Sequence, residues 1–151
     1  MTVDKSIGQL VDKLMFVART KGAAVSDVPE NLRYTSEHEW ARADGDRVVV
    51  GITDYAQDQL GDVVFVALPE PGTEVASGAT FGEVESTKSV SDLYSPVTGT
   101  VAERNDALEG SPELINQDPY GKGWLIVIQA ADADLGQLLE PDAYRRHIEE
   151  A

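Results

Sequence analysis

The chain has 151 residues and a formal net charge of −15, with 27 acidic side chains against 12 lysines and arginines. Such an acidic surface repels nucleic-acid phosphates and anionic lipids, which excludes nucleic acids and membranes as expected partners. Cysteine is absent and the two histidines lie far apart in the sequence, so we expect neither disulfide bonds nor a metal site. The length fits one domain with room for a tail.

The first 27 residues differ in pattern from the rest. Their apolar side chains recur at helical spacing, at Ile7, Leu10, Val11, Leu14, Met15 and Ala18. This apolar stretch is too short to cross a membrane, and three aspartates argue against a mitochondrial transit peptide. We expect residues 1–27 to be an N-terminal extension, either a short helix or disordered, and residues 28–151 to form the domain.

Short strands separated by closely spaced turns are expected from residue 32 onward. The turn signal at residues 44–46 lies between His38 to Arg42 and the β-branched run Arg47 to Ile52, which predicts a hairpin. Thr53 is a suitable N-cap for a short helix over residues 54–60. The many short strands favour a small β-sandwich or barrel.

The middle and end of the chain continue this pattern. Residues 62–68 form the most apolar strand candidate, which we expect to be central in its sheet. The Ser-Pro pair at residues 111–112 predicts one helical turn, and residues 124–129 a last strand. Residues 134–139 and 141–149 are expected to be C-terminal helices.

One hairpin stands out because of the lysine at its tip. The alternation over residues 83–86 predicts a half-buried strand, and a second apolar run follows at residues 90–94. Between them lies Lys88, flanked by Thr87 and Ser89, whose hydroxyl groups suit a tight turn. From the spacing alone, an ordinary solvated surface lysine is the favoured interpretation.

Four motifs, in the right order, change that interpretation. They are Tyr34 to Trp40 (YTSEHEW), Gly51 to Gln57 (GITDYAQ), Glu85 to Gly99 (ESTKSVSDLYSPVTG) and Asn116 to Trp124 (NQDPYGKGW). Together the motifs resemble the H-protein family of the glycine cleavage system, and the likeness runs from about Val28 to the C-terminus. The resemblance implies an all-β, barrel-sandwich hybrid of the lipoyl/biotinyl-domain type, a flattened antiparallel β-barrel with short peripheral and C-terminal helices. It also implies that Lys88 carries lipoate as N6-lipoyl-lysine.

The resemblance assigns roles to three acidic residues as well. Glu85 matches the position, three residues before Lys88, that helps the modifying ligase to recognise the hairpin. Glu39 and Asp92 match positions that border the cleft receiving the loaded arm, whereas Glu37 stands where the family often has serine. For each acid the alternative is an ordinary solvated carboxylate.

The implied function is that of a carrier rather than an enzyme. A glycine decarboxylase that uses pyridoxal phosphate would transfer the aminomethyl group of glycine to the lipoyl arm and release carbon dioxide. A tetrahydrofolate-dependent aminomethyltransferase would then take the one-carbon unit, and dihydrolipoyl dehydrogenase would reoxidise the arm. Lipoate ligase or a lipoyl/octanoyl transferase would attach it. We expect a monomer in the bacterial cytoplasm, or in the mitochondrial matrix if the source is eukaryotic.

Other functions stay open at this stage. Biotin domains usually place methionines beside the modified lysine, so Thr87 and Ser89 favour lipoate over biotin. A relay protein that passes its lipoyl group to other complexes would carry the same motifs. An enzyme that uses Lys88 as a Schiff-base nucleophile would require a desolvated lysine, whereas this turn predicts an exposed one. His38 has no nucleophile partner in the pattern, and we expect it to be structural.

Overall fold

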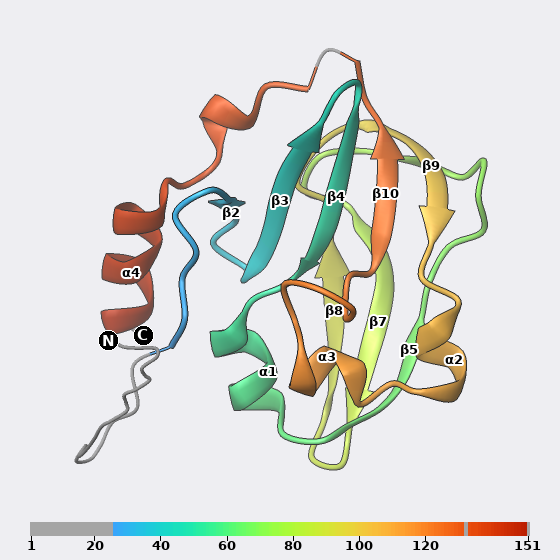
Figure 1. The fold of residues 1–151 in the computed structure, drawn as a ribbon, viewed down its shortest axis with the longest axis vertical. Coiled ribbons are helices and arrows are strands. Elements are labelled where there is room, and N and C mark those ends of the chain that lie inside the picture. Colours follow the sequence, from blue (N-terminus) through green and yellow to red (C-terminus); the bar gives the residue numbers. More distant parts are fainter. Residues whose placement is uncertain (1–25, 132, 151) are drawn as a thin grey trace.

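Two antiparallel β-sheets pack face to face in the computed structural model, which describes residues 26–131 and 133–150 (Figure 1). The larger sheet has the strand order β2-β3-β4-β10-β9-β6, and the smaller has the order β5-β7-β8. The expected all-β barrel-sandwich fold is thereby confirmed, as two separately hydrogen-bonded sheets rather than one continuous barrel.

The elements follow the predicted order closely. The larger sheet contains β2 (Arg33–Tyr34), β3 (Glu39–Asp44), β4 (Arg47–Ile52), β6 (Glu74–Val75), β9 (Gly99–Arg104) and β10 (Ile126–Gln129). The smaller sheet contains β5 (Val63–Ala67), β7 (Thr80–Ser86) and β8 (Val90–Tyr94). The helices are α1 (Asp54–Leu60), α2 (Ala107–Gly110), α3 (Leu114–Gln117), the 3-10 turn η1 (Leu135–Gln137) and α4 (Pro141–Glu149). The expected C-terminal helices are present, the first of them shortened to η1.

The β3–β4 hairpin is built around a buried tryptophan. Trp40 is fully buried and pairs with Gly51 across the two strands. A Cβ atom at Gly51 would lie 2.5 Å from the Trp40 ring, so only glycine fits beneath the indole. The indole Nε1 donates a hydrogen bond of 3.0 Å to the carbonyl of Pro119, which ties the hairpin to the loop before β10.

Helix α1 begins and ends as its sequence predicts. The Thr53 hydroxyl accepts a 3.1 Å hydrogen bond from the backbone N–H of Ala56, as an N-cap should. Gly61 ends the helix with a φ of 80°, and its N–H donates to the carbonyl of Gln57. In Figure 1 the helix lies beside the lower end of the β7–β8 hairpin, where Lys88 is found.

Strand β5 differs from the prediction. It was expected to be central, but it is an edge strand of the smaller sheet. Val63 is buried, whereas Val64 and Phe65 are 49% and 56% exposed, and the pairing with β7 shifts register between Val63 and Phe65. An unbroken apolar run does not distinguish a strand covered on both faces from an edge strand with an apolar outer face.

The core has two parts. Between the sheets lie Val48, Val50, Ile52, Val84, Leu93, Val101, Ile126 and Ile128, with further apolar side chains around them. A second cluster joins the outer side of the larger sheet to α4, where Tyr34 and Tyr144 stack with ring centroids 4.6 Å apart. Burial of Tyr144 against the sheet therefore contributes to holding helix α4 in place.

The predicted domain boundary at residue 28 stays a prediction. The helix expected within residues 1–27 falls on residues 1–25, which lie outside the described residues. Ser26 and Asp27 are described and belong to no helix or strand. The Asp27 N–H donates to the Asp54 carboxylate, and the Asp27 carbonyl accepts from the Tyr120 hydroxyl at 2.6 Å. Val28 is buried. Asp27 thus belongs with the folded part of the chain.

We propose that the domain folds without residues 1–25. A chain beginning at Ser26 should melt within about 2 °C of the full chain, whereas one beginning at Glu30 should melt roughly 5 °C lower, because it loses the Asp27 contacts and the burial of Val28. Thermal unfolding by circular dichroism measures both. A large loss in the chain beginning at Ser26 would show that residues before it stabilise the sandwich.

Candidate functional site

The turn that carries Lys88 is fixed by a buried serine. The Ser86 hydroxyl accepts hydrogen bonds of 3.1 Å from the N–H groups of Lys88 and Ser89, and the Ser86 N–H donates to the Ser89 carbonyl. Ser86 is buried, so water competes weakly for these bonds. The sequence pattern assigned this role to the hydroxyl groups of Thr87 and Ser89. The serine that performs it is the last residue of β7.

The tip is also braced against the loop after α1. The Thr87 N–H donates a 3.1 Å hydrogen bond to the carbonyl of Asp62. The exposed side chain of Lys88 crosses Gly61, where an added Cβ atom would lie 3.3 Å from the lysine Cε. Lys88 is thus an exposed side chain on a rigid turn, as predicted, which disfavours the Schiff-base enzyme because that chemistry needs a desolvated amine.

A cleft of about 380 Å³ opens beside this tip. Its wall is formed by the turn before β3, by α1 and by strands β7 and β8, and its lining includes Glu37, Glu39, Ile52, Leu60, Asp92 and Leu93. The volume falls within the roughly 300–1,000 Å³ typical of small-ligand sites. Apolar and acidic side chains both line the cleft, which suits an apolar chain that ends in a cation.

Glu39 lies at the cleft but is almost fully buried, with 1% of its surface exposed. One carboxylate oxygen accepts from the Thr35 hydroxyl at 2.5 Å, and the other accepts from the Tyr94 N–H at 3.1 Å. Burial raises the pKa of Glu39 to about 7, although both hydrogen bonds act in the opposite direction. The alternative of an ordinary solvated acid is therefore wrong for Glu39.

The other two predicted acids lie on the small sheet. Asp92 is exposed on the edge strand β8 and lines the same cleft as Glu39. Glu85 is exposed on β7, paired with Val90, and does not line the cleft. The structure thus brings Glu39 and Asp92 to one cavity and leaves Glu85 on the outer face of the sheet.

A hydrogen-bonded group at the wall of the cleft was not predicted from the sequence. The Nδ1 atom of His38 lies 2.8 Å from the Tyr144 hydroxyl, which lies 2.7 Å from the Thr53 hydroxyl. Burial and the neighbouring His147 lower the pKa of His38, so its ring is neutral at neutral pH. His38 is packed and hydrogen-bonded, as expected of a structural histidine, and it also lines the cleft. The sequence did not predict Tyr144 as the partner of His38, because its only signal was its place on the apolar face of α4.

The described residues contain neither a candidate membrane span nor a metal-binding cluster. Among residues 26–131 and 133–150, no helix is both long and apolar enough to cross a membrane. The same part of the chain contains no group of three or more acidic or histidine side chains that could hold a metal ion.

The sequence pattern of one family, described as glycine cleavage H-protein, matches residues 32–151. The chain belongs to this family. The glycine cleavage system H protein of Mycobacterium avium (strain 104) is 58% identical over 132 residues, which cover 83% of this chain and 100% of the relative. The probable glycine cleavage system H protein of Haloarcula marismortui is 56% identical over 124 residues, which cover 82% and 98%.

A solved structure agrees with the sequence relatives. The crystal structure of a glycine cleavage system H protein from Mycobacterium marinum has a TM-score of 0.75 and 43% identity to this H-protein, covering 81% of this chain and 99% of that one. The family expected from the four motifs is confirmed. This H-protein is thus the lipoyl-carrier component of the glycine cleavage system and works with the other components of that system.

The raised pKa of Glu39 predicts a specific pH dependence of stability. Because the folded state holds this proton more tightly than the unfolded state, the stability gained from Glu39 is complete below about pH 4.5 and is lost as the pH rises through 7. Between pH 5 and 8 the parent should lose roughly 2–3 kcal/mol of unfolding free energy relative to Glu39→Gln. Urea unfolding at several pH values measures the difference.

A matched control is available in the same turn. Glu37 is exposed and lines the same cleft, and Glu37→Gln should keep the parental pH dependence. Identical pH profiles for the parent and Glu39→Gln would show that the buried carboxylate does not hold its proton near neutral pH.

Proposed function

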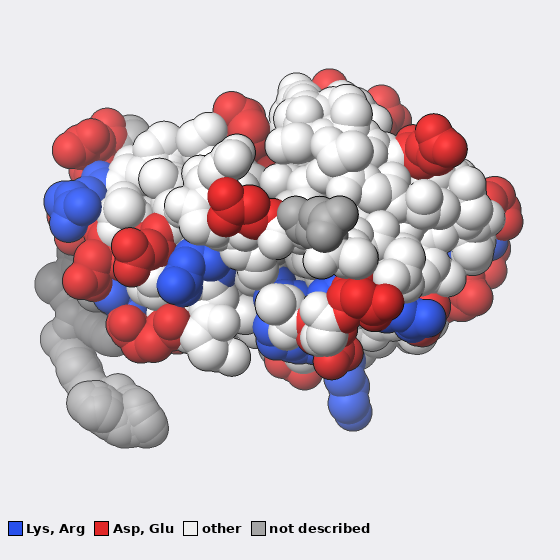
Figure 2. Space-filling model, turned by 90° about the horizontal axis from the view of Figure 1, so that it is seen from above, with Lys and Arg blue, Asp and Glu red and all other residues white. Residues whose placement is uncertain are grey.

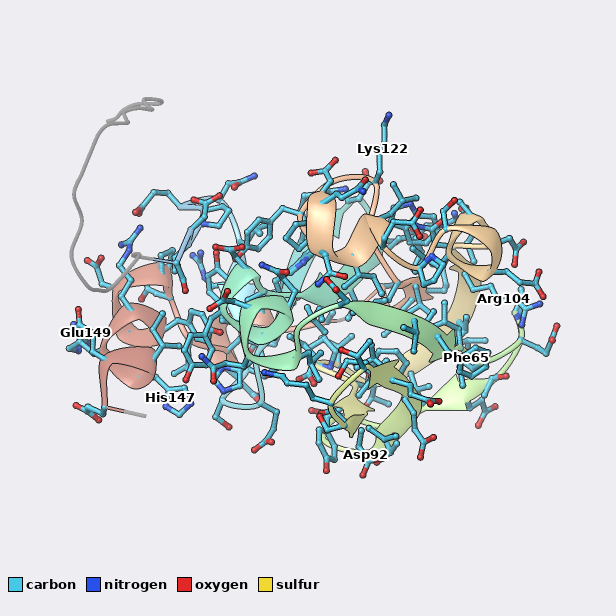
Figure 3. All side chains as sticks on the ribbon, turned by 90° about the horizontal axis from the view of Figure 1, so that it is seen from below. Phe65, Asp92, Arg104, Lys122, His147 and Glu149 are labelled. Carbon is cyan, nitrogen blue, oxygen red and sulfur yellow. The ribbon has the colours of Figure 1, made fainter. Side chains whose placement is uncertain are left out.

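We propose that Lys88 is the lipoyl attachment site and that its arm carries the aminomethyl group of glycine between the enzymes of the system. The observation that carries this proposal is the position of Lys88, exposed at the tip of a braced hairpin and next to the cleft. Lys122 is the other lysine between residues 26 and 150, and it points away from the molecule on the side opposite Asp92 (Figure 3).

The reach of the arm fits both of its tasks. Acylation of the Lys88 amine removes its charge, and the lysine stem plus the acyl chain would span roughly 10 Å or more. The neighbouring Ser89 lines the cleft, so an arm that starts at Lys88 can turn back into it or extend toward a partner enzyme. A rigid turn with a long flexible extension serves a carrier, because only the extension needs to move.

The chain supplies attachment and orientation, and the partner enzymes supply catalysis. When attached, the lipoyl group would supply a disulfide sulfur to accept the aminomethyl group from a glycine decarboxylase that uses pyridoxal phosphate and releases carbon dioxide. A tetrahydrofolate-dependent aminomethyltransferase would take the one-carbon unit and free ammonia, and dihydrolipoyl dehydrogenase would restore the disulfide. Lipoate ligase or a lipoyl/octanoyl transferase loads Lys88, and the exposed Glu85 is placed to be contacted by that enzyme.

We further propose a monomer that works in the cytoplasm, which suits the bacterial and archaeal sources of the relatives. Sedimentation of the purified chain, whose mass is 16.3 kDa, tests the monomer. Fractionation of the source cells tests the compartment.

The lysine assignment is tested by substitution. Lys88→Arg should abolish lipoylation and all support of glycine cleavage, while the melting temperature stays within about 2 °C, because the residue is exposed and the charge is kept. Intact-mass spectrometry and peptide mapping after incubation with a lipoate ligase, lipoate and ATP measure the loading. Lys122→Arg is the matched control and should be loaded normally. Lipoate mapped to Lys122 in the parent would overturn the assignment.

The cleft acids are proposed to hold the loaded arm. An aminomethyl group places an amine, mostly protonated at neutral pH, at the end of the arm. Exposed Asp92 and buried Glu39 offer carboxylates to it, and an arriving cation would favour the ionised form of Glu39. A charge-assisted hydrogen bond here contributes roughly 1.5–3 kcal/mol, which shelters the labile one-carbon unit from water.

Removing both carboxylates should shorten the life of the loaded form. Glu39→Gln combined with Asp92→Asn should speed its spontaneous decay roughly tenfold to a hundredfold and leave lipoylation of Lys88 intact. Release of formaldehyde or ammonia from the loaded carrier alone measures the decay. Glu83 pairs with Asp92 across the strands but does not line the cleft, so Glu83→Gln is the control and should decay at the parental rate. Decay at the parental rate in the double variant would rule out these carboxylates as the arm's holders.

A further inference from the structure

The exposed apolar side chains gather at one place. Among the described residues, the large hydrophobic side chains with substantial exposure are Val64, Phe65 and Val90, at 49%, 56% and 58%. Single exposed apolar residues are ordinary on a protein surface. Here, however, all three lie on the smaller sheet, whose hairpin carries Lys88.

The strand register aligns two of them with Glu85, which the family resemblance implies is recognised by the loading enzyme. Phe65 pairs with Glu85, and Glu85 pairs with Val90, which makes one row across the sheet from β5 through β7 to β8. Glu85 is three residues before Lys88, and at about 3.3 Å per residue the row lies within roughly 10 Å of the tip. Figure 3 labels Phe65 and Asp92, which come from the two edge strands of this sheet.

The charge of this face is of one sign. Strands β5, β7 and β8 contain the exposed acids Glu83, Glu85 and Asp92, and none of the three strands contains a lysine or an arginine. The opposite end of the molecule carries charges of both signs. Figure 2 views the molecule from that end, away from the hairpin tip, and shows basic side chains close to acidic ones. The face beside Lys88 therefore suits an apolar contact on a partner surrounded by basic groups.

We propose that this outer face is the docking surface for the acyl-transferring enzyme that loads Lys88, an inference that rests on the proposed function. The outer face is defined by Val64, Phe65, Glu83, Glu85 and Val90. Its apolar part anchors the enzyme, and its acids orient an enzyme surface rich in arginine and lysine.

The loading enzyme is the occupant because it must act before the arm exists. An extended lysine side chain reaches only about 6 Å from its Cα atom, so the enzyme must contact the residues around the tip for the amine to enter its active site. Enzymes that act later meet an arm that spans roughly 10 Å or more in total, and need less of this surface. The Lys88 stem crosses Gly61, and the cleft opens at the β8 edge of the outer face, where Val90 also lines it.

The outer face takes no part in the chemical step. The deprotonated Nζ of Lys88 attacks the carbonyl carbon of an acyl adenylate or acyl thioester. The amide C–N bond forms, the bond to AMP or to the thiol breaks, and the amine proton passes to a base of the enzyme or to water. Docking residues therefore affect the KM for the carrier and leave kcat nearly unchanged.

The test measures initial rates of lipoylation of the full unmodified chain by a purified lipoate ligase with lipoate and ATP. Phe65→Ser combined with Val90→Ser should raise the KM for the carrier roughly tenfold or more at an unchanged kcat. Phe65→Leu combined with Val90→Ile keeps the apolar surface and should retain the parental KM. Glu83→Gln should raise the KM for the carrier and reduce the salt dependence of that KM. Glu74 is an exposed acid of the other sheet, and Glu74→Gln should change neither quantity.

Competition gives a second, independent measurement. The Lys88→Arg chain cannot be loaded and should inhibit lipoylation of the parent, while the same chain with Phe65→Ser and Val90→Ser should inhibit roughly tenfold less. Far-ultraviolet circular dichroism establishes that each variant is folded. An equal KM and equal inhibition in the folded serine variants would overturn the docking surface.

The two proposals fail in different ways. A parent that is not acylated at Lys88 under these conditions would refute the attachment site itself. Suppose instead that the parent and the serine variants are all acylated normally, but the variants slow the decarboxylase or aminomethyltransferase step. That result would assign the outer face to a later enzyme and overturn this inference.

Discussion

A single buried carboxylate joins the two sheets at the cleft. Glu39 is the first residue of β3 in the larger sheet, and its side chain accepts the backbone N–H of Tyr94 at the end of β8 in the smaller sheet. The Thr35 hydroxyl binds the other oxygen and fixes the turn before β3. Because a carboxylate so deeply buried is costly unless its oxygens are hydrogen-bonded, the turn, the strand end and the acid must be placed together. The shape of the cleft depends on this arrangement.

The lysine hairpin follows the same principle with a neutral group. A hydroxyl bonded to two successive N–H groups closes the turn at Ser86, and a backbone bond from Thr87 to Asp62 joins that turn to the neighbouring loop. Neither contact involves the Lys88 side chain. The chain therefore holds the backbone of the turn still and leaves the amine available, which is the division of work that a covalent carrier needs.

Much of this could be predicted from the sequence because the signals are local. The β3–β4 hairpin, the cap of α1 at Thr53, and the turn around Lys88 each depend on residues within a few positions of one another. The edge position of β5 could not be predicted, since the run at residues 63–67 reads the same whether one face or both faces are covered. The family resemblance supplied the candidate acids, but no local pattern distinguishes buried Glu39 from exposed Glu37 two residues earlier.

The contact between the Tyr144 and Thr53 hydroxyls couples the two ends of the domain in time as well as in space. Strands β7 and β8 are adjacent in sequence and leave the ribosome before α4. The helix that walls the cleft is supported by a side chain from the last element of the chain. During synthesis the residues of the lysine hairpin therefore precede the side chain that completes the support of the cleft wall.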